Sequence, residues 1–136
     1  LPKARPPQIM AVDDDPLIRR LLEVQLTSAG YEIQTAASGE EALTMALAHR
    51  PDALIVDLIL TGMSGTELIL QMKSRPEFNG LPILAVTGGN IDKSKFSILS
   101  SFAIPTFSKP WDEENLFDQI ENALIGATIF AKQQKT

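Results

Sequence analysis

Short runs of apolar and β-branched residues alternate along the chain with stretches in which apolar residues recur every three or four positions. The runs have the length of strands, and the recurring pattern is typical of amphipathic helices. The predicted strands cover residues 8–12, 31–36, 53–57, 82–87 and 104–108. The predicted helices cover residues 16–29, 39–49, 65–74, 91–101 and 113–126, and the last helix could continue further. Strand and helix thus alternate five times, which favours a doubly wound α/β fold with a parallel sheet between two layers of helices.

Capping residues stand at the starts of the predicted helices. Asp15 precedes Pro16, a residue favoured at the first helical position, so we interpret Asp15 as an N-cap. Ser38 and Glu41 have the S-x-x-E spacing of a capping box. Ser64 is a suitable cap for the third helix. These signals set the helix boundaries independently of the apolar pattern.

Composition narrows the possible functions. A net charge of −5 argues against direct binding of nucleic acid or of an anionic membrane, because such proteins present basic surfaces. The chain has no cysteine and one histidine, which excludes disulfides, thiol catalysis and Cys- or His-rich metal sites. No apolar run reaches the roughly 20 residues that span a membrane, and no signal peptide is recognisable. We therefore expect a cytoplasmic protein with no membrane partner.

The length of 136 residues predicts one domain. The proline-rich residues 1–7 are expected to form an extended lead-in. Residues 8–126 would form the domain, and residues 127–136 would extend the last helix or form a linker.

Charged and polar residues gather where the predicted strands end. Asp13 and Asp14 follow the first strand, Asp57 ends the third, Thr87 ends the fourth, and Lys109 follows the fifth. In doubly wound sheets the ligand site lies outside the carboxyl ends of the strands. Carboxylates suit Mg²⁺, whereas a lysine and a hydroxyl suit phosphoryl oxygens. Because a carboxylate can act as a nucleophile, the sequence predicts magnesium-dependent transfer of a phosphoryl group to an aspartate.

The same residues carry a resemblance to a known family. The segments "VDDDP", "DLILTGMSG", "VTGG" and "FSKPW" resemble, in order and in spacing, the receiver domain of two-component response regulators, in the CheY-like superfamily. The resemblance covers about residues 8–126. It implies a flavodoxin-like fold in which five parallel strands have the order 2-1-3-4-5, with five helices.

The resemblance implies a role for each acid. Asp57 would be the phosphoacceptor, and Mg²⁺ would contact Asp14, Asp57 and the backbone carbonyl of Ile59. Asp13 would reach the ion through a water molecule. By the same resemblance the Thr87 hydroxyl would bind the phosphoryl group, and Lys109 would form an ion pair with Asp57 or with its phosphoryl group. The bond between Lys109 and the proline after it would be cis.

Several positions depart from the family pattern; Leu60 and Ser64 are conservative replacements, whereas Thr61 and Thr106 are not. Thr61 replaces a common proline, so the loop after the third strand loses a rigid residue. Thr106 stands where many receivers carry tyrosine or phenylalanine. Phe107 cannot substitute, because neighbouring strand residues point to opposite faces of a sheet. We therefore expect no aromatic switch, and expect signalling to pass through the loop at 88–91 and the helix after it.

The implied function is that of a phosphoacceptor in signal transduction. A sensor histidine kinase or a phosphotransfer protein would donate the phosphoryl group, and the surface formed by the fourth helix, fifth strand and fifth helix would switch toward an unknown downstream protein or output domain. The protein would not be an enzyme beyond catalysing its own phosphorylation and dephosphorylation.

Two alternatives remain: an interaction module that is not phosphorylated, and a phosphohydrolase of the aspartyl-phosphate type. The intact set of five residues counts against the first, and the absence of a cap insertion counts against the second.

Overall fold

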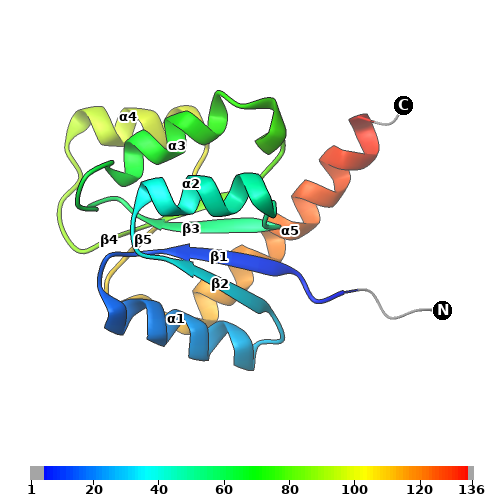
Figure 1. Ribbon diagram of the computed structural model, residues 1–136, viewed down its shortest axis with the longest axis horizontal. Helices are drawn as coiled ribbons and strands as arrows, with labels where there is room; N and C mark the ends of the chain where they lie inside the picture. The colour runs from blue at the N-terminus through cyan, green and yellow to red at the C-terminus, as the bar shows by residue number, and fades with distance from the viewer. Residues whose placement is uncertain (1–4, 135–136) are drawn as a thin grey trace.

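A five-stranded parallel sheet lies at the centre of the molecule in the computed structural model, which describes residues 5–134 (Figure 1). The strands are β1 (Gln8–Val12), β2 (Glu32–Ala36), β3 (Ala53–Asp57), β4 (Ile83–Thr87) and β5 (Thr106–Ser108). They pair in the order β2-β1-β3-β4-β5, which confirms the predicted topology. Residues 1–4 of the expected lead-in lie outside the described residues.

Helices cover both faces of this sheet. They are α1 (Pro16–Ser28), α2 (Gly39–Ala48), α3 (Gly65–Lys73), α4 (Lys93–Ser101) and α5 (Glu113–Gln134), with a short 3-10 helix, η1 (Pro76–Phe78), after α3. Helices α1 and α5 pack on one face, and α2, α3 and α4 pack on the other (Figure 1). Within residues 5–134 no helix combines the length and the apolar character needed to cross a membrane.

The predicted caps form the helix starts. The Asp15 carboxylate accepts a hydrogen bond from the N–H of Leu17 at 2.9 Å, with proline next to it as the first helical residue. The Ser38 hydroxyl accepts from the N–H of Glu41 at 3.1 Å. The Glu41 carboxylate in turn accepts from the N–H of Ala37 at 3.2 Å, one residue earlier than in a standard capping box. Asp15 thus has the capping role that sets it apart from the two acids before it.

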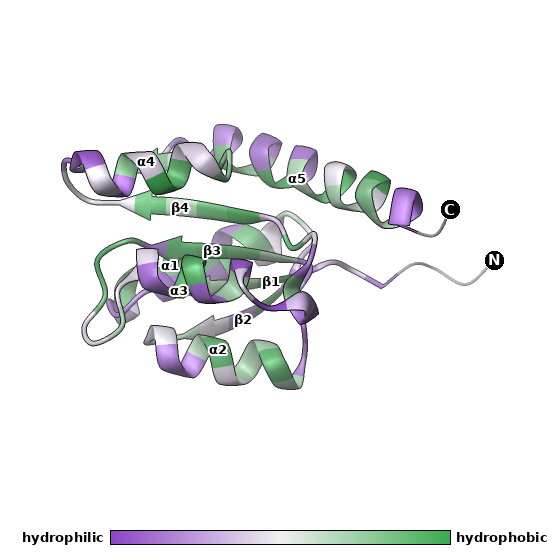
Figure 2. Ribbon diagram, turned by 90° about the horizontal axis from the view of Figure 1, so that it is seen from above, coloured by the Kyte–Doolittle hydropathy of each residue, from purple (hydrophilic) through white to green (hydrophobic). Residues whose placement is uncertain are grey.

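Two apolar layers form the core. Strands β3 and β4 are buried throughout, and Figure 2 colours both as hydrophobic along most of their length. Their apolar residues lie between the two helix layers. Successive residues of each strand face opposite layers, so that Ile55 joins the core under α1 and α5 while Leu54 and Val56 join the other. Phe107 is buried in the α1/α5 layer and Thr106 is exposed, which confirms the predicted strand parity.

Two elements begin two residues later than the sequence predicts. Strand β5 begins at Thr106 because the preceding residues still form the turn after α4, where Ala103 has a φ of 52°. Pro105 has no N–H to donate to a neighbouring strand. Helix α4 begins two residues later than predicted, because Asp92 serves as its N-cap and accepts from the N–H of Lys95 at 2.9 Å.

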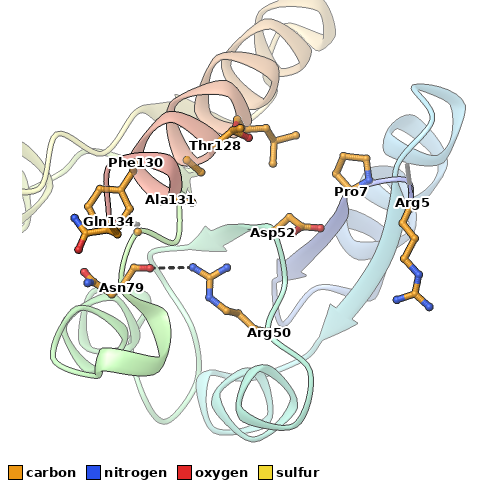
Figure 3. Close-up of a pocket in the computed structure, with 12 residues that line it drawn as sticks. Arg5, Pro7, Arg50, Asp52, Asn79, Thr128, Phe130, Ala131 and Gln134 are labelled. Carbon is orange, nitrogen blue, oxygen red and sulfur yellow. Dashed lines mark hydrogen bonds between the residues drawn. The ribbon is translucent and has the colours of Figure 1, made fainter. Parts of the chain in front are cut away.

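Helix α5 continues past Gly126 as far as Gln134 and projects beyond the sheet (Figure 1). There the Phe130 ring lies so close to Gly80 that a Cβ atom at Gly80 would stand 2.5 Å from a ring carbon. A cavity of about 680 Å³ adjoins this contact, and Arg50, which borders it, donates a hydrogen bond to the Asn79 carbonyl at 3.1 Å (Figure 3). The cavity lies at the amino ends of the strands, at the opposite edge of the sheet from the predicted site.

Candidate functional site

The three predicted acids come together at the carboxyl edge of the sheet. Asp13 and Asp14 follow β1, and Asp57 is the last residue of the adjacent strand β3. One carboxylate oxygen from each lies within 4.8 Å of the other two. Asp13 and Asp57 are buried, at 2% and 6% exposure, whereas Asp14 is exposed. We refer to these three residues as the acid cluster.

Lys109 bridges the two buried acids. Its ammonium group donates to Asp13 Oδ2 at 2.8 Å and to Asp57 Oδ2 at 3.0 Å. The contact with Asp57 was expected from the resemblance, whereas the one with Asp13 was not. Three carboxylates thus face one lysine, and negative charge remains in excess at the site.

The second oxygen of each buried acid is held by the backbone. Asp13 Oδ1 accepts from the N–H of Asp15 at 2.9 Å, and Asp57 Oδ1 accepts from the N–H of Ile59 at 3.0 Å. Both buried carboxylates therefore have fixed orientations. Ile59 is 58% exposed and its side chain is a hydrocarbon, so this residue offers the site only its backbone groups.

The backbone of Thr87 is hydrogen-bonded to that of Lys109. Its carbonyl accepts from the N–H of Lys109 at 2.8 Å. Its hydroxyl donates to the Gly89 carbonyl at 3.3 Å and accepts from the Gly89 N–H at 3.4 Å. The structure thus places Thr87 beside Lys109, with its hydroxyl engaged in the loop after β4. The peptide bond between Lys109 and Pro110 is cis, as expected from the resemblance.

Two contacts of the loop after β3 were missed by sequence reasoning. The Thr61 hydroxyl donates to Asp14 Oδ2 at 3.1 Å, and the N–H of Met63 donates to the Glu40 carboxylate at 3.3 Å. The sequence identified Thr61 only as the loss of a proline. The one signal in the sequence was that Thr61, a residue with a hydroxyl group, follows Asp57 by four positions. The sequence could not show its partner, because Asp14 lies on another loop.

Burial and charge shift the pKa values of Asp57 and Lys109. Burial raises the pKa of Asp57, and the charge of Asp13 adds to this effect, while hydrogen bonds from Ile59 and Lys109 oppose it. For Lys109, burial alone would lower the pKa, but Asp13 and Asp57 together outweigh burial and raise it. Lys109 therefore remains an ammonium ion at neutral pH.

The raised pKa of Asp57 predicts a pH-dependent effect on stability. An acid whose pKa is higher in the folded protein stabilises it at low pH, and this contribution is lost as the pH rises through the folded pKa. Asp57→Asn should therefore raise the melting temperature at about pH 7, and the difference from the wild type should shrink toward about pH 4. Thermal unfolding at both pH values tests this, with Asp118→Asn on the exposed side of α5 as the control. A difference that grows as the pH falls would contradict the prediction.

The acid cluster fits a hard divalent cation. It supplies carboxylate oxygens from three residues, has excess negative charge, and includes one exposed acid through which an ion can enter. These are properties that favour Mg²⁺ or Ca²⁺ over softer metals. The described residues therefore include an acidic pocket that could hold a metal ion.

Comparisons of sequence place the chain among known signalling proteins. The family model for the response regulator receiver domain matches residues 9–121. Response regulator PleD of Caulobacter vibrioides is 32% identical over 115 residues, which are 85% of this chain and 25% of that protein. Response regulator MprA of Mycobacterium leprae is 34% identical over 117 residues, which are 86% of this chain and 50% of that protein. The chain thus spans a quarter to a half of the length of these curated relatives.

Solved structures agree with these sequence matches. A putative response regulator from Chloroflexus aurantiacus superposes with a TM-score of 0.81 at 36% identity, covering 88% of this chain and 98% of that one. The chemotaxis protein CheY4 of Vibrio cholerae gives a TM-score of 0.78 at 29% identity, covering 87% of this chain and 98% of that one. With its strand order and its sequence in agreement, the chain belongs to the response regulator receiver domain family of two-component signalling.

Proposed function

We propose that Asp57 is the phosphoacceptor of this receiver domain. The observation that supports it best is the position of Asp57 at the end of a buried strand, where its Oδ2 atom meets Lys109 beside the other two acids. The donor would be a phosphohistidine on a sensor histidine kinase or a phosphotransfer protein. The phosphohydrolase and the interaction module that is not phosphorylated are not favoured, because the whole fold and family match a receiver.

The metal ion we propose is Mg²⁺. Asp14, Asp57 and the backbone carbonyl of Ile59 would hold it directly, and Asp13 would hold it through a water molecule. The bound ion would neutralise negative charge on the phosphoryl group as it is transferred. Asp14 is the exposed member of the acid cluster, which supports its role as the ligand that an arriving ion meets first.

The side chains around Asp57 suit the transfer of the phosphoryl group and its binding after transfer. A carboxylate oxygen of Asp57 forms a bond to phosphorus while the bond from phosphorus to the histidine nitrogen breaks. Lys109, held as a cation by the acids, then pairs with a phosphoryl oxygen. The Thr87 hydroxyl exchanges its bond to the Gly89 carbonyl for one to the phosphoryl group. The domain would thus catalyse only its own phosphorylation and dephosphorylation.

Intact mass spectrometry with acetyl phosphate tests this function. With Mg²⁺ present, the wild-type protein should gain the mass of one phosphoryl group, and the adduct should decay over time. Without Mg²⁺ the adduct should be strongly reduced, because Lys109 is then the one cation among residues 5–134 that faces the three carboxylates, and it cannot offset their repulsion of the incoming phosphate. Rapid hydrolysis of acetyl phosphate with no adduct would favour a phosphohydrolase, and no reaction at all would favour the interaction module.

We further propose that switching occurs without an aromatic residue at position 106. Thr106 is small and exposed, and Phe107 is fixed in the core under α1 and α5. Nothing lies within 4 Å of a Cβ atom at Gly89, so the loop after β4 has room to move. The signal would reach a downstream protein or output domain through this loop and the surface formed by α4, β5 and α5.

Beryllofluoride, which mimics the phosphoryl group, should therefore displace the loop at 88–91 and α4 while Phe107 stays buried. NMR spectra with and without the mimic measure this through amide shifts and through contacts of the Phe107 ring. Large shifts are expected at 88–91 and along α4, with unchanged ring contacts to α1 and α5. A Phe107 ring that leaves the core while α4 stays still would disprove the proposal.

A further inference from the structure

Thr61 links two loops at the edge of the sheet. Its hydroxyl, in the loop after β3, donates to Asp14 Oδ2 in the loop after β1, across 47 positions of the sequence. Among residues 5–134 this is the one hydrogen bond recorded for the Asp14 carboxylate. The bond occupies one oxygen of Asp14 and leaves the other available to a cation.

The other two acids of the cluster are held quite differently. Asp13 and Asp57 are buried, and each is fixed by a backbone N–H on one oxygen and by Lys109 on the other. Asp14 is exposed, and no hydrogen bond from a backbone N–H or from Lys109 to its carboxylate is found among residues 5–134. An exposed carboxylate without a partner samples several rotamers, and fixing one of them costs conformational entropy when an ion binds. The orientation of Asp14 therefore depends on Thr61.

The loop that carries Thr61 is itself held in place. The N–H of Met63 donates to the Glu40 carboxylate at 3.3 Å, and the N–H of Gly65 donates to the Leu58 carbonyl at 3.1 Å. Directly after Thr61, Gly62 has a φ of 78°, a conformation that suits glycine. These contacts tie the loop to α2 and to the end of β3, so the backbone that carries Thr61 is held near Asp14.

We propose that Thr61 is a positioning residue that holds Asp14 ready for a divalent cation and thereby sets the affinity of the acid cluster for Mg²⁺. This inference rests on the proposed magnesium site. Hydrogen-bond partners of metal ligands commonly change affinity by about 10- to 100-fold. Because Thr61 and Asp14 are both exposed, we expect the lower end of this range.

Isothermal titration with MgCl₂ tests the role of the Thr61 hydroxyl. Thr61→Val, which keeps the shape and removes the hydroxyl, should weaken Mg²⁺ binding roughly tenfold. Thr61→Ser restores the donor and should bind as the wild type does. Thr128→Val is the matched control: Thr128 is an exposed threonine on α5 whose hydroxyl bonds the Leu124 carbonyl, far from the cluster. Thermal unfolding without Mg²⁺ should give similar melting temperatures for all four proteins.

The outcomes separate this inference from the proposed function. If the wild type binds Mg²⁺ and Thr61→Val binds equally well, the role of Thr61 is wrong and the metal site stands. If Thr61→Ser is weakened as much as Thr61→Val, the effect does not come from the hydroxyl, and the inference fails. It also fails if Thr128→Val loses as much affinity as Thr61→Val. If the wild type does not bind Mg²⁺, the proposed metal site itself is wrong.

Discussion

Asp57→Asn should abolish labelling of the protein by acetyl phosphate while leaving the fold intact. The asparagine amide keeps one oxygen that can accept the hydrogen bond of Ile59, and Lys109 keeps its bond to Asp13, but the amide is not a nucleophile toward phosphorus. The expected loss is therefore complete. Intact mass spectrometry in the presence of Mg²⁺ measures the labelling, and circular dichroism and thermal unfolding check that the variant is folded.

Variants of the other acids provide the controls for this experiment. Asp118→Asn, on an exposed position of α5, should be labelled as the wild type is. Asp13→Asn and Asp14→Asn should be labelled more slowly, with the phosphoryl group still on Asp57 by peptide mapping. If labelling survives Asp57→Asn and disappears in Asp13→Asn or Asp14→Asn, the proposed assignment of Asp57 as the phosphoacceptor is wrong.

The sequence was most informative about the strands that position the acids. Strand β3 was predicted residue by residue, because "ALIVD" is an apolar run that ends in a charge. Asp13 and Asp14 follow a similar run in β1. The carboxyl ends of parallel strands meet at one edge, so knowing where β1 and β3 end was sufficient to predict that these acids lie together.

Contacts between loops were beyond the reach of the sequence. Thr61 and Asp14 meet only because two loops, 47 positions apart in the sequence, take particular conformations. The bond from Lys109 to Asp13 likewise depends on how the lysine side chain extends along the edge of the sheet. Strand β5 was predicted too long for a related reason: Pro105 and the turn after α4 override the apolar pattern of residues 104–108. Periodicity predicts elements and faces, whereas these details depend on tertiary packing.

The start of α3 lies so close to the end of β3 that a substitution at Gly65 should have a large effect on stability. Gly65 is the first residue of α3, and a Cβ atom there would lie 2.1 Å from the backbone oxygen of Asp57 and 2.7 Å from the Cα of Leu58. Both atoms belong to the backbone, so no side chain can rotate away to make room. Gly65 thus allows the helix to start directly against the residue that we propose as phosphoacceptor.

Gly65→Ala should therefore destabilise the protein and also disturb the site. Overpacking of this kind costs typically about 1–3 kcal/mol, and we expect about 3 kcal/mol because the clash is with the backbone. In a domain of this size that corresponds to a fall in melting temperature of roughly 10 °C. The backbone of Asp57 must shift to relieve the clash, so labelling by acetyl phosphate should slow as well. Thermal unfolding and the rate of labelling measure the two effects.

Gly126→Ala is the matched control for this substitution. Gly126 lies within α5, where nothing stands within 4 Å of an added Cβ atom. The same chemical change should therefore stabilise the protein, by about 0.8–1 kcal/mol from helix propensity alone. Its distance from the acid cluster predicts an unchanged labelling rate. If Gly65→Ala were as stable as the wild type and labelled at the same rate, the contact between α3 and the end of β3 could not be as close as the structure has it, and the placement of Asp57 against α3 would have to be revised.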